Sequence, residues 1–339
     1  MTQPFRDFAA VRAAALTLPA PDPDMMAAAR ERDLQLTKPT GALARLEDCV
    51  FHLAGWQRRA IPRLDDIHIA IFAGNHGVAA RGVSAYPAEV TVQMVANFER
   101  GGAAINQLAR LHGATLSVAA LDLDRPTEDF SAAAAMTEVD CLAAINTGAA
   151  AVPSSCDLLV PGEMGIGNTT TAAALAAALY GGNAASWVGP GTGVNGDALA
   201  NKIGVVDAAL GFHAASLGDP LEALRRVGGR ELAALFGAVL MARLKSVPVL
   251  LDGFVVGAAA GVLARLNPGG LEHCLAGHVS AEPGHRRLLS ELQKPALLDL
   301  GMRLGEGAGA AVAIGLLKAA VVCHTGMATF AEASVSQRG

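Results

Sequence analysis

Charged, aromatic and cysteine residues are all scarce in this chain of 339 residues. Charged residues make up 17% of the sequence and aromatic residues 4%, against 52% hydrophobic residues, and this balance excludes global disorder. Lys and Arg number 26 and Asp and Glu number 31, which leaves a net charge of −5. Because there is no basic surplus to bind a phosphate backbone, we expect no nucleic-acid partner.

Neither a membrane span nor a disulfide framework is indicated. The longest uncharged stretch, residues 164–196, is interrupted by Gly, Asn, Thr and Pro, which does not fit a lipid-facing helix. Residues 1–16 carry an acid early and lack the apolar centre and cleavage site of a signal peptide. The five cysteines are odd in number and widely spaced, which fits neither disulfides nor a zinc knuckle. We therefore expect a cytoplasmic protein with no membrane partner.

What the sequence does contain is an alternation of short β-branched runs and longer alanine-rich segments, which is typical of βα units. Strands are predicted at residues 67–72, 115–121, 157–160, 186–188, 247–251 and 296–300. Helices are predicted at residues 89–111, 170–180, 197–215, 231–244, 254–266 and 310–323. The pattern predicts an α/β fold with a parallel sheet flanked by helices.

The two ends of the chain differ from its middle. After three closely spaced prolines, residues 25–36 and 43–58 predict amphipathic helices joined by a turn at 38–41, and the last 30 or so residues are helical again. We therefore expect a large α/β domain over residues 61–305 and a small helical domain built from residues 1–60 and 306–339.

Residues 158–171 form the strongest candidate site. A strand leads into a glycine turn, and Asn and Thr residues are placed to cap the alanine-rich helix that follows, an arrangement that suits a phosphate. The P-loop lysine and the dinucleotide-binding spacing are both missing. A plain helix cap with close-packed glycines is the alternative.

A second glycine-rich loop covers residues 187–195 and precedes a helix that carries Lys202. Loops that follow neighbouring strands line one crevice at the carboxyl edge of a parallel sheet, so the two loops are expected to meet. Lys202 is placed either to contact a phosphate there or to lie in solvent.

Two further segments contain candidate side chains. Residues 72–87 include His76, which fits a structural role better than a base, and Tyr86, which suits either stacking on a flat ring or ordinary packing. In residues 304–309, Glu306 lies between glycines at a helix start. It is either a simple N-terminal acid or a base in a desolvated pocket. The nine histidines are dispersed, and no metal-binding spacing predicts a metal site.

Taken in order, residues 38–43, 73–78, 82–87, 162–170, 304–307 and 327–330 resemble the nicotinate-nucleotide–dimethylbenzimidazole phosphoribosyltransferase family, which contributes to cobalamin lower-ligand assembly. The resemblance spans residues 30–336. It implies a Rossmann-like parallel sheet, a small helical domain from both termini and a homodimer. It also implies transfer of the 5-phosphoribosyl group from nicotinate mononucleotide to 5,6-dimethylbenzimidazole, giving α-ribazole 5′-phosphate and nicotinate, without a cofactor.

The resemblance also implies roles for individual residues. Glu306 resembles the family's general base, and Glu163 is expected near the ribose or C1′. The residues expected to hold the phosphoribosyl group are Gly165, Ile166, Gly167, Asn168, Thr169, Thr170, Gly191 and Lys202. Those expected around the acceptor are Ser84, Tyr86, Gln93, Met164 and Leu304.

The chain departs from the family pattern at three places. Asn75 stands where relatives often have Asp, Ala308 replaces a usual Ser or Thr, and residues 324–326 lack a common acid. These departures leave the reaction class in place but put the acceptor in question. A different azole or a phenol as acceptor, and a non-catalytic relative that only binds a nucleotide or azole, are the alternatives.

Overall fold

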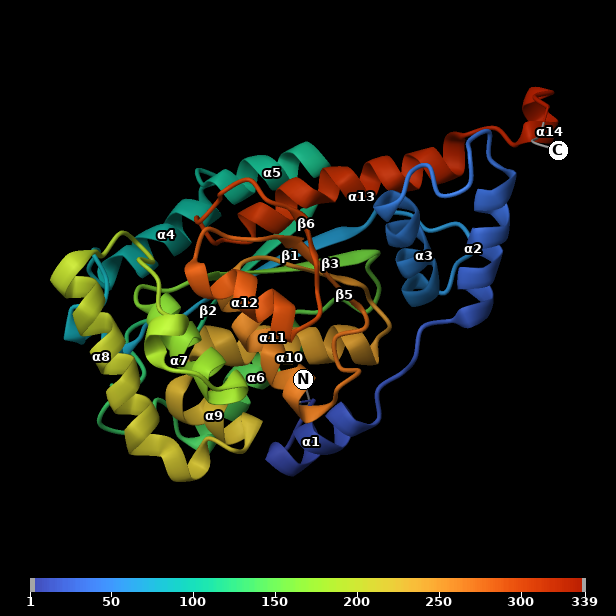
Figure 1. Cartoon of the computed structure of the whole chain (residues 1–339). Helices are drawn as coiled ribbons and strands as arrows, with labels where there is room; N and C mark the ends of the chain where they lie inside the picture. Colours follow the sequence, from blue (N-terminus) through green and yellow to red (C-terminus); the bar gives the residue numbers. More distant parts are fainter. Residues whose placement is uncertain (1–3, 337–339) are drawn as a thin grey trace.

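A six-stranded sheet, all of whose neighbouring strands run parallel, organises the fold (Figure 1). The computed structural model describes residues 4–336. The strands, in the spatial order β2-β1-β3-β4-β5-β6, are β1 (Ile67–Ala73), β2 (Thr115–Ala120), β3 (Leu158–Met164), β4 (Val249–Leu251), β5 (Cys274–His278) and β6 (Ala296–Leu298). The predicted α/β fold class is confirmed.

The strands are apolar because the sheet is covered on both faces. In β1, Ile67, Ile69 and Ile71 point into one core, whereas Ala70 and Phe72 point into the other. Figure 1 shows two helices along the upper face, and these are α5 (Ala104–His112) and α13 (Ala308–Gly326). The lower face is covered by α6 (Glu138–Ala150), α7 (Asn168–Tyr180), α10 (Arg230–Leu244) and α11 (Phe254–Leu266).

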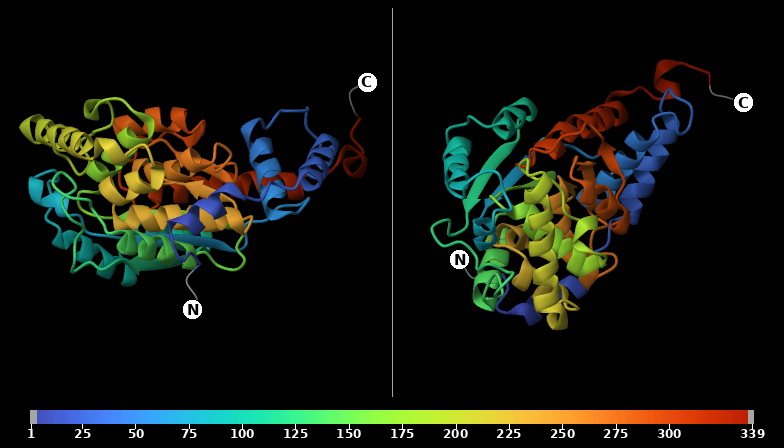
Figure 2. Two further views of the ribbon diagram at one scale, coloured as in Figure 1. Left: turned by 90° about the horizontal axis from the view of Figure 1, so that it is seen from below. Right: turned by 60° about the vertical axis from the view of Figure 1, so that its left-hand side comes forward.

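Helices from the N-terminal third of the chain lie beside its C-terminal segment at one end of the molecule (Figure 2). Here α2 (Pro23–Gln35) and α3 (Arg45–Gln57) pack together, α3 also packs on α13, and the short α14 (Phe330–Ala333) follows. Arg32 Nε donates to the His324 carbonyl at 3.0 Å, and Leu36 forms an isolated β-bridge with Thr329. Helix α1 (Phe8–Leu16) instead packs on α11. That the terminal segments form a domain of their own stays a prediction.

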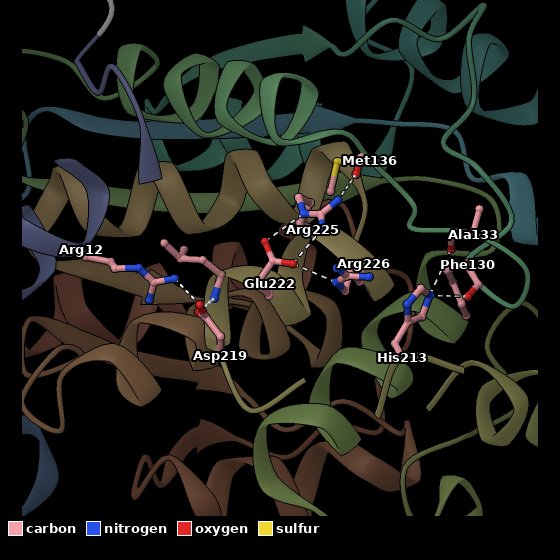
Figure 3. A network of polar contacts seen from close by, with 10 residues as sticks. Arg12, Phe130, Ala133, Met136, His213, Asp219, Glu222, Arg225 and Arg226 are labelled. Carbon is pink, nitrogen blue, oxygen red and sulfur yellow. Dashed lines mark hydrogen bonds and ion pairs between the residues drawn. The ribbon is translucent and has the colours of Figure 1, made fainter. Parts of the chain in front are cut away.

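Below the sheet, polar contacts fasten the irregular segment before α6 (Figure 3). On α9 (Pro220–Val227), the Glu222 carboxylate accepts hydrogen bonds from Arg225 and Arg226, and Arg225 Nη1 donates to the Met136 carbonyl at 3.1 Å. At the end of α8 (Gly196–His213), His213 Nε2 lies 2.9 Å from the Phe130 carbonyl.

Several predicted elements differ from the structure. The strand predicted at 186–188 is wrong: the Asn183 side chain accepts from Ser186 N and closes a short 3-10 turn, Ala184–Ser186. The single helix predicted over 89–111 is broken at Gly101, where φ is +77°, into α4 (Glu89–Glu99) and α5. Strand β5 was not predicted, because its Gly and His obscure the apolar pattern.

Helix α13 is long and apolar enough to cross a membrane by length and composition alone. In the fold, 56% of its apolar window is buried inside the molecule. Ile314 and Leu317 are fully buried in the same core as Ile69 of β1. The apolar side chains of α13 therefore pack on the sheet.

Candidate active site

A cavity of about 690 Å³ lies at the carboxyl edge of the sheet. Its walls come from the ends of β3, β4 and β5, from α4 and from the segment before α13. Strand order reverses between β1 and β3, and open α/β sheets bind ligands at such a switch point. The volume is that of an ordinary small-molecule site.

Two glutamates from distant parts of the sequence meet in this cavity. Glu163 is the penultimate residue of β3, which continues past the predicted end at residue 160, and Glu306 precedes α13. Glu306 N donates to the Glu163 carbonyl at 3.2 Å. A Cβ at Gly162 would lie 2.8 Å from the Glu306 carbonyl carbon, so only glycine permits this approach.

Glu306 has an unusual backbone conformation. Its φ is +64°, in the left-handed region that non-glycine residues seldom adopt, and the neighbouring Gly305 and Gly307 also have positive φ. Such strain persists only where the surrounding structure holds it, and it concentrates at functional sites. The side chain is buried, and its Oε2 has no hydrogen-bond partner among residues 4–336.

The two carboxyl groups differ from ordinary glutamates in basicity. Burial, reinforced by the charges of Asp252 and Glu231, raises the pKa of Glu163 to about 8. Burial and the charge of Asp252 raise the pKa of Glu306 to about 7. At neutral pH, Glu163 is thus mostly a neutral acid, while Glu306 is close to half ionised, which suits a general base.

The loop between β3 and α7 forms the floor of the cavity. The helix begins after Gly167, whose φ of +93° makes it a backbone cap without a side-chain hydrogen bond. Asn168, expected as a cap, instead donates from Nδ2 to the Glu163 carboxyl group. The N-terminus of α7 meets the cavity at Asn168 and Thr169, where free N–H groups and the helix dipole favour an anion.

A buried pair supports this loop from below. His76 Nε2 lies 2.5 Å from Glu231 Oε1, and His76 Nδ1 lies 3.2 Å from Thr171 Oγ1 on α7. Any side chain at Gly165 would place its Cβ 2.6 Å from the Gly74 carbonyl and 3.0 Å from Glu231 Oε1. His76 thus lies behind the loop, where it supports the backbone.

Lys202 is buried and not solvated. Its Nζ donates to Thr169 Oγ1 and to the Gly189 carbonyl, both at 2.9 Å. Burial, partly offset by Glu282, lowers its pKa to about 8. Lys202 thus connects the second glycine-rich loop to the first turn of α7. Glu282, which precedes α12 (Pro283–Glu291), accepts from Gly191 N at 2.9 Å and holds the same loop from another side.

The opposite wall of the cavity is apolar. Tyr86 and Leu304, both more than half exposed, and the half-buried Met164 lie there. Val90 and Met94 join them, one helical turn apart on α4. This side suits a flat, weakly polar ring, whereas the α7 side suits a phosphate.

Known proteins of one family match this chain over nearly its whole length. A family model described as phosphoribosyltransferase matches residues 18–335. A nicotinate-nucleotide–dimethylbenzimidazole phosphoribosyltransferase from Cereibacter sphaeroides is 56% identical over 99% of this chain and 100% of its own length. One from Mesorhizobium japonicum is 57% identical with the same coverage. The chain belongs to the nicotinate-nucleotide–dimethylbenzimidazole phosphoribosyltransferase family.

Solved structures lead to the same family. The crystal structure of a member from Thermus thermophilus superposes with a TM-score of 0.86 at 41% identity, covering 94% of this chain and 100% of that one. The similarity in fold therefore extends over most of the chain.

Most residues that the family resemblance singled out meet in the cavity. The residues that line it are Glu163, Met164, Gly165, Ile166, Asn168, Thr169, Gly191, Tyr86, Leu304 and Glu306. Gly167, Thr170 and Lys202 lie behind this lining. Ser84 lies outside it, and its hydroxyl is 3.0 Å from that of Thr192 on the rim. Gln93 is exposed on α4 and does not line the cavity, whereas the next residue, Met94, does.

Several lining residues were not predicted. Asp252 and Gly253 directly follow the predicted strand 247–251, so an acid at a strand's carboxyl end was the available signal. His278 and Glu282 were missed because β5 was not predicted. Arg303, on the rim, donates from Nη1 to the Gly191 carbonyl at 3.2 Å. Within residues 4–336, no group of three or more His, Cys, Asp or Glu side chains is placed to hold a metal ion.

Proposed function

We propose that this protein transfers the 5-phosphoribosyl group from nicotinate mononucleotide to 5,6-dimethylbenzimidazole. The products are α-ribazole 5′-phosphate, used in the nucleotide loop of cobalamin, and nicotinate. The observation that carries the proposal is the placement of Glu306, a buried carboxylate with one unpartnered oxygen, in the same cavity as the N-terminus of α7. Membership of the phosphoribosyltransferase family supports it.

The donor fits the polar side of the cavity. Its phosphate binds at the first turn of α7, near Thr169, with the Lys202 ammonium group directly behind. Glu163, mostly protonated at neutral pH, donates a hydrogen bond to a ribose oxygen near C1′. In this way the chain fixes the ribose while leaving C1′ open to the acceptor.

The departure of nicotinate from C1′ needs no acid catalyst from the protein. Nicotinate departs from C1′ with the bonding electrons, and its cationic pyridinium nitrogen becomes neutral. One azole nitrogen attacks the opposite face of C1′, which inverts its configuration. The positive charge that develops on the azole acidifies the other N–H, and Glu306 takes that proton.

Glu306→Gln tests the proposal. The wild-type protein, mixed with nicotinate mononucleotide and dimethylbenzimidazole without added metal, should form α-ribazole phosphate, detected by mass spectrometry. The variant keeps the shape of the side chain but cannot accept the proton, so turnover should fall by about 10²–10⁴ while donor affinity in calorimetry stays within about threefold. Turnover at the wild-type rate would refute the base assignment.

The acceptor is the more open part of the proposal. The family resemblance implies a Ser or Thr where this chain has Ala308, next but one after the proposed base, and another azole or a phenol is therefore the alternative acceptor. Discrimination by methyl groups in an apolar pocket amounts to only about 1–3 kcal/mol. Product yields across benzimidazoles, adenine and phenols rank the acceptors, and binding without any product would instead identify a non-catalytic relative.

We also propose that the protein works as a cytoplasmic homodimer. The family resemblance supports this, as do Tyr86 and Leu304, apolar residues of the cavity wall that are 56% and 55% exposed and would be shielded by a second subunit. Light scattering that gives the mass of one chain at micromolar concentration would contradict the dimer.

A further inference from the structure

Asp252 is one of four carboxyl side chains that line the cavity, together with Glu163, Glu282 and Glu306, and the proposed reaction gives it no role. It follows β4 directly, is 2% exposed, and lines the cavity together with Glu163 and Glu306. Its Oδ1 accepts a hydrogen bond of 2.8 Å from the backbone N–H of Ala310. Ala310 is in the first turn of α13, four residues after Glu306, so Asp252 fixes the backbone that positions the proposed base.

His278 lies beside Asp252 on the neighbouring strand, and among residues 4–336 neither of its ring nitrogens has a hydrogen-bond partner. It is the last residue of β5, is almost fully buried, and its Nε2 lies 3.3 Å from Asp252 Oδ1. A Cβ at Gly309 would overlap the His278 ring, and a Cβ at Gly253 would touch Nε2 at 3.6 Å. Glycines on both sides thus leave room for the imidazole beside Asp252.

Further charged and titratable groups surround Glu306 and Asp252, and they come from every helix, strand and loop that packs around the cavity. Those that line the cavity with Glu306 are Glu163 from β3, Asp252 after β4, His278 from β5, Glu282 before α12 (Pro283–Glu291) and Arg303 on the same loop as Glu306. Behind the lining are the His76–Glu231 pair, Lys202 and His285. Arg303 and Lys202 both act on Glu282, which leaves Asp252 as the charge that acts on both Glu163 and Glu306.

We propose, on the basis of the function proposed above, that Asp252 is a positioning residue for the transfer. It anchors the first turn of α13 and places a second buried carboxyl group in the same cavity as Glu306, which takes the acceptor's proton. The proton moves from the azole nitrogen to a Glu306 carboxylate oxygen, and Asp252 itself exchanges no proton.

Electrostatics supports this role. A carboxylate close to a second carboxylate is harder to ionise, so the neighbour makes it a stronger base. Burial is the first cause of the raised pKa of both glutamates, and Asp252 is the neighbouring charge that raises the pKa of Glu306 further and has the largest charge effect on Glu163. A glutamate near its usual pKa of about 4.3 would hold a proton too weakly for efficient transfer at neutral pH.

The test is Asp252→Asn, whose amide oxygen still accepts from Ala310 while the charge is removed. The readout is a ¹³C NMR titration of protein labelled at glutamate carboxyl carbons, in which the Glu306 signal is identified by its loss in Glu306→Gln. We expect the Glu306 midpoint to fall by about one pH unit from its wild-type value near 7. The acid limb of the kcat/KM profile should shift to lower pH by the same amount, and the plateau value of kcat should fall roughly three- to tenfold.

Asp299→Asn, which removes an exposed carboxylate paired with Arg286, is the matched control and should leave the midpoint unchanged. Asp252→Ser is the second variant if Asp252→Asn does not fold. An unchanged Glu306 midpoint in the folded Asp252 variant overturns the inference. The titration needs no substrate, so a wild-type protein that forms no α-ribazole phosphate refutes the proposed function without deciding the role of Asp252.

Discussion

At the scale of single residues, the site depends on carboxyl groups that are removed from water. Glu163 and Glu306 lie within one cavity, yet Asn168 donates a hydrogen bond to Glu163, while Glu306 Oε2 has no partner within the described part of the chain. Burial raises the pKa of both, to about 8 for Glu163 and about 7 for Glu306. The two groups can thus act as a hydrogen-bond donor and a base at the same pH.

The activity should depend on pH through Glu306. Burial and the charge of Asp252 raise its pKa to about 7, and the ionised form is the active base, so kcat/KM should fall about tenfold per unit below pH 7. It should fall again above about pH 8, where Glu163 and Lys202 lose the protons with which they hold the donor. Rates measured between pH 5 and pH 9 check this. A profile that is flat down to pH 5 would show that the ionisation of Glu306 does not limit the reaction.

Glu163→Gln should stabilise the protein in alkaline solution. The folded carboxyl, with a pKa of about 8, keeps a proton that the unfolded chain loses above about pH 4.3, so its contribution to stability falls as pH rises between these values. Glutamine carries no charge to bury. In urea unfolding, the free energy of unfolding of the variant should therefore exceed that of the wild type by about 2 kcal/mol at pH 9 and differ little at pH 5. A loss at pH 9 would contradict this.

At the scale of elements, α6 and α10 are held unusually close by glycine. A Cβ at Gly148 would lie 2.7 Å from the Ala234 Cα, and one at Gly237 would lie 3.0 Å from the Ile145 Cα, so each helix presents a glycine to the other's backbone. This contact lets α10 carry Glu231 beneath the Gly165 loop. The helix pair therefore contributes to the site from outside the cavity.

Gly148→Ala should force the two helices apart. Neither backbone can yield locally, so the free energy of unfolding should fall by about 3 kcal/mol. Gly211→Ala on α8 is the control, because a Cβ there meets nothing within 4 Å, and it should gain about 0.5–1 kcal/mol from helix propensity. Equal effects at both positions, measured by urea unfolding, would argue against backbone contact as the cause.

At the scale of the whole molecule, the helices α2 and α3 at one end of the fold are joined around a buried cation. Lys38 Nζ lies 2.7 Å from both Asp33 and Glu47, and the side chains of all three are at most 10% exposed. Lys38 keeps the pKa of Glu47 below its usual range. The turn predicted at residues 38–41 therefore links α2 and α3 through charge as well as through chain connection.

Lys38→Met should destabilise this end of the molecule. It leaves two carboxylates in a largely dry environment, at a cost of about 3–5 kcal/mol in unfolding free energy. Arg286→Met removes one side of an exposed pair with Asp299 and should cost less than about 1 kcal/mol. An equal loss of unfolding free energy in the two variants, measured by urea unfolding, would show that the Lys38 cluster contributes no more than a surface ion pair.

The sequence by itself determined the fold class and the glycine-rich loops, because apolar periodicity and glycine placement are local properties. It also indicated Glu306 and the 162–170 loop, since these lie within short, specific segments. Only the tertiary structure decided that Met94 and not Gln93 lines the cavity, that Lys202 is buried, and that Asp252 and His278 join the two glutamates. These depend on strand order and helix rotation, which bring residues far apart in the chain into one low-dielectric space, and no local pattern encodes that meeting.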